Sequence, residues 1–194
     1  MRKLTGWRII FLVFAFHAVA IRLPALTAST LLSFDLTDGA SPRGSLVQGF
    51  DGNFYGTTEE GGVYGFGTLF EITPAGKLTA LYSFCSQGPP YCTDGAYPID
   101  GLVQATNGNF YGTNEFYGAY GGGTVFEITP KGVLTTLYSF CAQPGCTDGG
   151  SPYAGLVQAT NGNFYGTTYK RGGLRRWHGL RNHLRGHADH AAQL

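Results

Sequence analysis

Basic residues are scarce in the middle of this chain. Between residues 29 and 169 only Arg43, Lys77 and Lys131 are basic, against eleven acidic residues, which gives a net charge of −8. Nucleic-acid binding requires clustered Lys and Arg that neutralise phosphates. The shortage therefore excludes nucleic acid as the partner of this region, although the whole chain has a formal net charge of +1.

Histidine and helix-period hydrophobic patterns are also missing from residues 29–169. Without histidine, a serine-type triad has no general base in this region. The region holds 26 of the 31 glycines, a content that excludes a helical bundle. We predict no catalytic residue, no cofactor and no metal site, and we do not expect the chain to be an enzyme.

A long membrane-spanning run is absent from the N-terminus. The apolar run at residues 9–20 follows a basic start that ends at Arg8, and it is shorter than the ~20 residues that span a bilayer. This layout is typical of a secretory signal. We predict a signal peptide over residues 1–28, with cleavage after Ala20 or Ala28. The mature chain is expected to have no membrane span and to be secreted, periplasmic or at the cell surface.

The middle of the chain repeats itself. The segment Asn53–Thr57 recurs at 109–113 and 163–167, with a period of 56 and then 54 residues, and a Leu-Val-Gln triplet precedes each copy. A fixed period of this size indicates an array in which each copy is one supersecondary unit. Residues 29–169 are thus predicted to form a β-repeat domain of about 2.5 repeats of 54–56 residues.

Each repeat has the pattern of four short strands. Asn107-Gly108 is a signal for a two-residue turn, and Pro130 begins a second turn between apolar, aromatic-rich segments. In the second repeat the predicted strands are Leu102–Thr106, Asn109–Asn114, Thr124–Thr129 and Leu134–Phe140. Four antiparallel strands per unit are typical of a β-propeller blade. We predict an all-β fold of tandem four-stranded antiparallel repeats, with β-propeller-like blades in an incomplete propeller.

The repeated segments also resemble a known family. Gly123–Phe140, together with the sequence Leu-Val-Gln-Ala-Thr-Asn-Gly-Asn-Phe-Tyr-Gly-Thr, is similar to the GloVer (Gloeo/Verruco-type) repeat of bacterial exported proteins. The resemblance covers about residues 30–169. It implies an exported tandem-repeat protein with no established activity, and it brings no catalytic residues to this chain.

The cysteines occur as two local pairs, Cys85 with Cys92 and Cys141 with Cys146, each around a Thr-Asp-Gly sequence. The first repeat lacks both members of the pair. Thiols that are present or absent together in an exported chain indicate disulfides. A four-cysteine metal site is the alternative, but neither pair has the C-x2-C spacing that such sites use.

Acidic and aromatic residues divide into repeated and non-repeated positions. Repeated acids are interpreted as structural, with Asp94 and Asp148 in turns and Glu127 in a strand, solvated on the face opposite Phe126. The non-repeated acids, which are better candidates for chemistry, are Glu59, Glu60, Asp100 and Glu115. The loop aromatics that break the repeat, and are the candidate ligand contacts, are Tyr64, Phe66, Tyr91, Phe116, Tyr117 and Tyr120.

The tail, residues 170–194, does not continue the repeat. Its His and Arg residues suggest a metal or nucleic-acid site, but a shifted reading frame explains them better. Back-translation with permitted codons, read after skipping one base, gives Ser-Gly-Gly-Ala-Tyr-Gly-Gly-Gly-Thr-Val-Phe-Glu-Ile-Thr-Ser-Ala-Gly-Thr-Leu-Thr-Thr-Leu-His-Ser. This matches Gly118–Ser139 at nearly every position. We therefore expect a frameshifted tail and a truncated repeat array.

Three functional hypotheses remain open. The first is an exported non-enzymatic repeat protein that acts as a surface interaction or binding module, with a polysaccharide or a cell-surface protein as its partner. The second is an extracellular carbohydrate-active enzyme of propeller type that uses the non-repeated acids. The third is an inactive gene fragment. We favour the first hypothesis because no catalytic motif is visible in the repeats.

Overall fold

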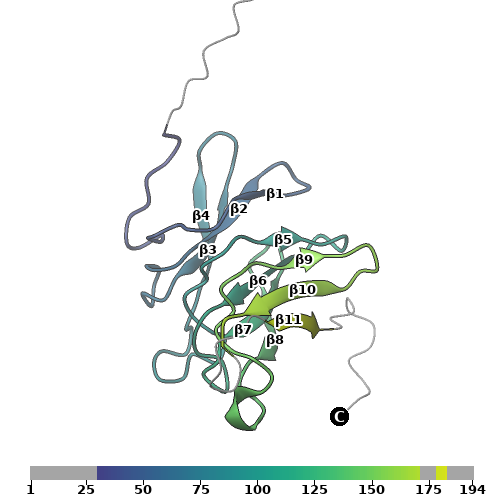
Figure 1. Ribbon diagram of the computed structural model, residues 1–194. Coiled ribbons are helices and arrows are strands. Elements are labelled where there is room, and N and C mark those ends of the chain that lie inside the picture. Colours follow the sequence, from purple (N-terminus) through teal and green to yellow (C-terminus); the bar gives the residue numbers. More distant parts are fainter. Residues whose placement is uncertain (1–29, 171–177, 183–194) are drawn as a thin grey trace, which may run out of the picture. The chain divides into compact units, whose positions relative to one another are not determined.

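The computed structural model describes residues 30–170 and 178–182 of the chain (Figure 1). The first sheet has the order β1-β2-β3-β4, with strands Val47–Gln48, Phe54–Thr58, Thr68–Ile72 and Leu78–Ser83. The second has the order β5-β6-β7-β8, with strands Val103–Gln104, Phe110–Asn114, Thr124–Ile128 and Leu134–Ser139. The third has the order β11-β10-β9, from strands Val157–Gln158, Phe164–Thr168 and His178–Asn182.

Every strand pair is antiparallel, and strands that follow each other in sequence are neighbours in each sheet. The predicted all-β fold of tandem four-stranded repeats is confirmed, and each complete sheet has the strand order of a propeller blade. Across the described ranges there is no helix long and apolar enough to cross a bilayer. The predicted signal peptide lies outside the described residues.

The first strand of each repeat is shorter than the sequence pattern predicts. β5 covers Val103–Gln104 rather than 102–106. The chain leaves the ladder at Ala105, whose N–H donates to the Asn109 carbonyl at 2.9 Å while its own carbonyl accepts the Gly108 N–H at 2.9 Å. The tight turn at Asn107-Gly108, with Gly108 at φ 86°, therefore takes over the hydrogen bonds that a longer strand would use.

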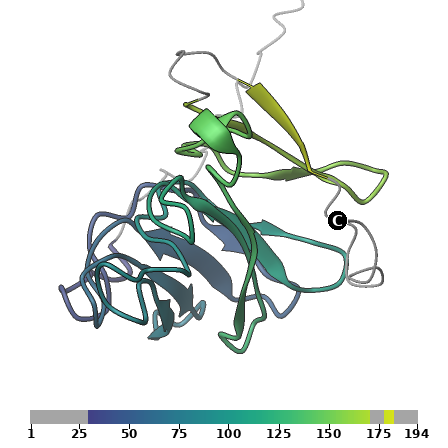
Figure 2. The ribbon, with the colours of Figure 1, turned by 90° about the horizontal axis from the view of Figure 1, so that it is seen from below.

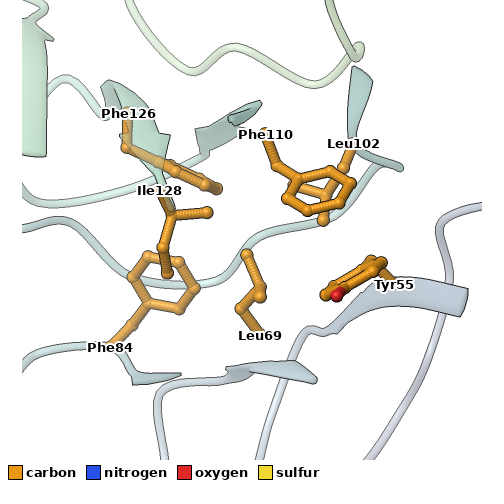
Figure 3. Close-up of a cluster of buried hydrophobic side chains, with 7 residues drawn as sticks. All are labelled: Tyr55, Leu69, Phe84, Leu102, Phe110, Phe126 and Ile128. Atoms are coloured by element: carbon orange, nitrogen blue, oxygen red, sulfur yellow. The ribbon is translucent and has the colours of Figure 1, made fainter. Parts of the chain in front are cut away.

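Aromatic side chains join one repeat to the next. Tyr55 of the first repeat packs against Phe110 of the second, with 4.2 Å between ring centroids. Tyr111 and Phe164 repeat the contact at 4.2 Å one repeat later. Figure 3 shows the cluster at the first junction, formed by Tyr55, Leu69, Phe84, Leu102, Phe110, Phe126 and Ile128. Burial of this apolar surface, at about 25 cal/mol per Å², is the main force that holds neighbouring repeats together.

A second aromatic contact also joins one repeat to the next. Phe84, just after β4, contacts Phe126 of the next repeat with 5.2 Å between ring centroids, and Phe34 contacts Phe70 at 4.9 Å. The sequence around Phe34 resembles a fourth strand, but residues 30–34 form none. Phe34 nevertheless keeps the packing role of its counterpart.

Glu127 corrects one expectation from the sequence. Predicted to be solvated, it is 6% exposed. Its Oε1 accepts hydrogen bonds from Asn109 Nδ2 at 2.5 Å, from the Tyr111 hydroxyl at 2.9 Å and from Asn107 Nδ2 at 3.4 Å. Burial, with the neighbouring Glu127 carboxylate, raises the pKa of Tyr111 to about 12. Strand alternation indicated the face opposite Phe126 correctly, but this face is buried too, because Tyr111, directly opposite Glu127, packs against Phe164 of the next repeat.

Removal of the Glu127 carboxylate should cost more stability than the same change in the first repeat. Glu71, the equivalent residue, is only partly buried and its carboxylate accepts one hydrogen bond, from Asn53. Glu127→Ala leaves the buried Tyr111 hydroxyl and the half-buried Asn109 amide without this acceptor, at about 1–3 kcal/mol for a fully buried group. In urea unfolding, the free energy of unfolding of Glu127→Ala should be at least about 1.5 kcal/mol lower than that of Glu71→Ala. Equal losses in the two variants would contradict this role.

The cysteines form the two predicted disulfides, Cys85–Cys92 and Cys141–Cys146. The second closes a short 3-10 turn, Pro144–Cys146, drawn as a green coil in Figure 2. The structural interpretation of the Thr-Asp-Gly acids also holds. Asp94 accepts a hydrogen bond from the Tyr82 hydroxyl at 2.8 Å, and Asp148 accepts the equivalent bond from Tyr138 at 2.8 Å.

The two disulfides differ in accessibility, and this predicts the order in which they are reduced. Cys85 and Cys92 are 0% and 1% exposed, whereas Cys141 and Cys146 are partly exposed. Because thiol–disulfide exchange requires access to a sulfur atom, dithiothreitol should reduce Cys141–Cys146 first under native conditions. Alkylation followed by peptide mass spectrometry measures the order. Earlier labelling of Cys85 or Cys92 would contradict the expectation.

Candidate functional site

The repeats differ most in two loops that lie next to each other. One loop precedes the first strand and the other follows the second strand, and they are joined by backbone bridges at Ala40–Glu60, Ala96–Phe116 and Gly150–Lys170. Strand residues here are nearly identical between repeats, whereas the loop residues are not: Glu60, Phe116 and Lys170 occupy equivalent positions. Loops on a rigid scaffold are where binding residues concentrate. We call this group the variable cluster: Arg43, Glu59, Glu60, Phe66, Tyr97, Glu115, Phe116, Tyr117, Tyr153, Tyr169 and Lys170.

Charged side chains from all three repeats meet in the variable cluster. Arg43 forms an ion pair with Glu59. Glu115 is 4% exposed, and burial raises its pKa, although a hydrogen bond from Tyr153 and the charges of Lys170 and Arg43 act in the opposite direction. The hydrogen bond to Glu115, together with burial, raises the pKa of Tyr153 to about 12. The cluster therefore holds one ion-paired carboxylate and one buried carboxyl whose pKa is raised.

Four aromatic rings form the other half of the variable cluster. Phe66 of the first repeat contacts Tyr97 at 5.5 Å and Tyr117 at 5.8 Å between centroids, with interplanar angles of 70° and 82°. Tyr97 contacts Phe116 at 6.0 Å and 88°. Edge-to-face pairs of this kind are worth about 0.5–1.5 kcal/mol beyond area burial. The rings form a chain of roughly perpendicular neighbours between two repeats.

The backbone beneath these rings takes an unusual conformation. Ser41, Tyr97 and Ser151 are equivalent residues with φ of 55°, 59° and 50°. Their carbonyls accept the N–H groups of Glu59, Glu115 and Tyr169 at 3.0–3.1 Å. A bulky residue at positive φ is an outlier, with a cost of order 1–3 kcal/mol, and such residues concentrate at functional sites.

Tyr117 is a second aromatic residue at positive φ, 63°, and its counterpart in the first repeat is Gly61 at φ 79°. Glycine adopts this region freely, whereas a tyrosine does so at a cost. Both tyrosines with positive φ belong to the ring chain of the variable cluster. The fold therefore accommodates strained tyrosines at two positions that are occupied by serine or glycine in other repeats.

The structure brings together half of the aromatic residues predicted from the sequence. Phe66, Phe116 and Tyr117 join the ring chain. The other three, at 43%, 70% and 60% exposure, make no ring contact in the part of the chain that is described; they are Tyr64, Tyr91 and Tyr120. Sequence reasoning missed Tyr97 and Tyr153. Comparison of Tyr97 with Ser41 and Ser151, its repeat equivalents, would have found the first of them.

Asp100, one of the non-repeated acids, has a structural role. Its carboxylate accepts the N–H groups of Gly101 at 2.7 Å and Gly155 at 2.6 Å. Its carbonyl accepts the Thr57 hydroxyl at 3.0 Å. Asp100 thus links three repeats through hydrogen bonds. The other acids selected from the sequence, Glu59, Glu60 and Glu115, all belong to the variable cluster. Glu59 and Glu115 occupy equivalent positions of the first two repeats, so the expectation that both are non-repeated is wrong.

No assembled metal site is present within residues 30–170. These residues contain no group of three or more His, Cys, Asp or Glu side chains placed to hold a metal ion. The histidines of the tail, whose spacing suggested a metal site, lie outside the described residues, except for His178, for which only the backbone position is described.

Comparisons with known proteins agree with the architecture. The family model of the Gloeobacter/Verrucomicrobia repeat matches residues 17–178. The chain belongs to this family. The resemblance seen in the sequence is thereby confirmed, and the match includes the first two sheets with β9 and β10 of the third.

One solved structure, provisionally named a gluconolactonase, is similar to this Gloeobacter/Verrucomicrobia repeat chain at 17% identity and a TM-score of 0.43. The match covers 63% of the chain and 40% of the length of that protein. No curated protein matches the sequence.

The buried carboxyl of Glu115 predicts a pH dependence of stability. Because its pKa is raised in the folded state, its protonated form favours folding, and this contribution is lost as the pH rises above the ordinary glutamate value of about 4.3. Glu115→Gln keeps an acceptor for the Tyr153 hydroxyl and removes the titration. Thermal unfolding between pH 4 and 7 should show a smaller decline for Glu115→Gln than for the wild type, and parallel curves would contradict this assignment.

Proposed function

We propose that this chain is an exported, non-enzymatic binding module whose variable cluster contacts a polysaccharide. The observation that carries the proposal is the ring chain of Phe66, Tyr97, Phe116 and Tyr117, which replaces small or unrelated residues of the other repeats. Ring faces pack against the apolar faces of sugars, and the neighbouring carboxyl, guanidinium and hydroxyl groups hydrogen-bond sugar hydroxyls.

Export is part of the proposal and has two supports. The basic and apolar pattern of residues 1–28 is typical of a secretory signal. The disulfides Cys85–Cys92 and Cys141–Cys146 fit an oxidising compartment. Expression with the native N-terminus in a bacterial host, followed by fractionation and N-terminal sequencing, tests it. We expect the mature protein outside the cytoplasm, cleaved after Ala20 or Ala28, and retention of the uncleaved chain in the cytoplasm would contradict export.

Binding is tested with the exported chain, its disulfides intact, in calorimetric titrations against a panel of neutral, acidic and amino polysaccharides. Phe116→Ala removes a ring that is 38% exposed. The variant should fold and should bind at least tenfold more weakly, a change of about 1.4 kcal/mol. Phe50→Ala is the matched control, because Phe50 is 74% exposed but lies in the turn at the other end of β2. Equal affinity of both variants would contradict the assignment.

A glycoside hydrolase is the alternative, and one observation favours it. Glu59 is paired with Arg43, while Glu115 is buried beside Tyr153 within the same cluster. Glycoside hydrolysis uses two carboxyl groups of which one is protonated and the other ionised. Release of reducing ends from any polysaccharide of the panel, lost in both Glu59→Gln and Glu115→Gln, would favour the hydrolase over the binding module.

A further inference from the structure

The carboxylates beside the ring chain differ in whether a cation accompanies them. Glu59 is paired with Arg43, and Glu115 is buried. Glu60 is exposed, and its carboxylate accepts a hydrogen bond from the Ser41 hydroxyl at 3.3 Å. Within residues 30–170 no Lys or Arg lies within ion-pair distance of Glu60. Glu60 is thus a solvent-accessible negative charge in the variable cluster without a cation of its own.

Glu60 lies close enough to the rings to act on them. Burial raises the pKa of the Tyr97 hydroxyl, and Tyr117 and the carboxylates of Glu60 and Glu59 add to this. The backbone geometry agrees, because Gly61, the residue after Glu60, forms a backbone bridge with Phe66, the first ring of the chain. The ring chain and the free carboxylate therefore belong to one surface.

This combination is suited to a positively charged group. A cation over an aromatic face is attracted by the ring quadrupole, at about 0.5–1 kcal/mol at an exposed site. Because neighbouring rings here are roughly perpendicular, a cation can contact more than one ring. A nearby carboxylate adds direct attraction. The repeat region, with its net charge of −8, steers cations towards the protein rather than away from it.

We infer that the ligand of the variable cluster is an amino sugar polymer, whose protonated amine lies between Glu60 and the ring chain while the sugar ring packs on Phe116. The inference rests on the proposed function, which identifies the ligand as a polysaccharide. The new element is that this polysaccharide carries positive charge. An N-acetylated sugar of the same length lacks the cation and keeps only the ring packing.

The test compares a glucosamine oligomer with the N-acetylglucosamine oligomer of equal length, by calorimetric titration of the full disulfide-bonded chain at a pH where the amines are protonated. The wild type should bind the glucosamine oligomer at least tenfold more tightly. Glu60→Gln should reduce that affinity to the level of the acetylated oligomer and leave the latter unchanged. Higher salt should lower the affinity for the charged glucosamine oligomer and leave the affinity for the acetylated oligomer nearly unchanged.

Asp51→Asn is the matched control for loss of one negative charge. Asp51 lies in the turn at the opposite end of β2 and is replaced by Asn at the equivalent positions 107 and 161, so the repeat accepts the change. This variant should keep the preference for glucosamine. Equal binding of both oligomers, with loss in Phe116→Ala, would overturn the inference and leave the binding module intact. Binding of neither oligomer would overturn it as well, and binding of no polysaccharide in the panel would overturn the proposed function too.

Discussion

Replacement of the five residues of β11 by Thr-Val-Phe-Glu-Ile should raise the melting temperature by about 10 °C. The changes are His178→Thr, Gly179→Val, Leu180→Phe, Arg181→Glu and Asn182→Ile. They introduce the sequence of β7, which is also the sequence that the hypothesis of a shifted reading frame predicts at these positions. The backbone register supports the exchange, because β11 pairs with β10 as β7 pairs with β6: Phe164 lies opposite Asn182 as Phe110 lies opposite Ile128.

Within the described residues, Thr168 and Phe140 are buried and lack contacts that their counterparts in the first repeat make, and the exchange is expected to supply these contacts. Thr168 is 1% exposed and its hydroxyl has no hydrogen-bond partner in the described structure, whereas Thr58, its equivalent, bonds to the Thr68 hydroxyl at 2.8 Å. Phe140 is equivalent to Phe84, which contacts Phe126, and position 180 takes the place of Phe126 in the register.

The size of the effect follows from these groups. Burial of a Phe side chain contributes about 1.5–3 kcal/mol, and a hydrogen bond contributes about 1 kcal/mol. For a chain of this length each 1 kcal/mol raises the melting temperature by about 2–4 °C. The control carries the same residues in the order Val-Thr-Glu-Phe-Ile, which keeps strand propensity but moves Phe and Glu to opposite faces while Ile stays in place. Scanning calorimetry that finds no gain, or an equal gain for the control, would contradict the register of β10 and β11.

Phe126→Ala should remove a large part of the stability of the repeat domain. Phe126 is 0% exposed and lies over Gly112, where an added Cβ would come within 2.6 Å of the Phe126 ring. It also contacts Phe84 of the preceding repeat. Truncation of a buried Phe costs about 3–5 kcal/mol, against a total of about 5–15 kcal/mol for an ordinary domain.

Urea unfolding monitored by tyrosine fluorescence measures this loss. Phe50→Ala is the control, since Phe50 is 74% exposed and a surface change of this kind stays within about 0.5 kcal/mol. The tyrosines that report the transition remain in both variants. A loss below 1 kcal/mol in Phe126→Ala would mean that the junction between the first two repeats does not depend on this ring.

The sequence predicts the strands well because turns and alternation agree with each other. The Asn107-Gly108 turn fixes the register of β5 and β6, and that register is repeated wherever the motif recurs. The burial of Glu127 could not be predicted in this way. Alternation identifies the two faces of a strand but not what covers them, and here Tyr111, directly opposite Glu127 in the register, supplies one of its donors.

The variable cluster could be predicted only in part. Phe66, Phe116 and Tyr117 break the repeat pattern and were found for that reason, but the same criterion also selected Tyr91, which is 70% exposed in the first disulfide loop. The contact between Phe66 and Tyr97 joins residues of two repeats. No local pattern encodes such a contact, because it depends on how one sheet packs against the next.

The proposed function places sugar binding in the loops of the variable cluster, and not in the hairpin turns at the other end of the strands. Amide chemical shifts of the isotopically labelled chain, followed during titration with the glucosamine oligomer and with its N-acetylated counterpart, test this most directly. We expect shift changes confined to residues 59–67, 96–101, 114–118 and 151–155, with the turn residues 49–53 and 105–109 unaffected. Shifts at the turns, or no shifts with either oligomer, would contradict the claim.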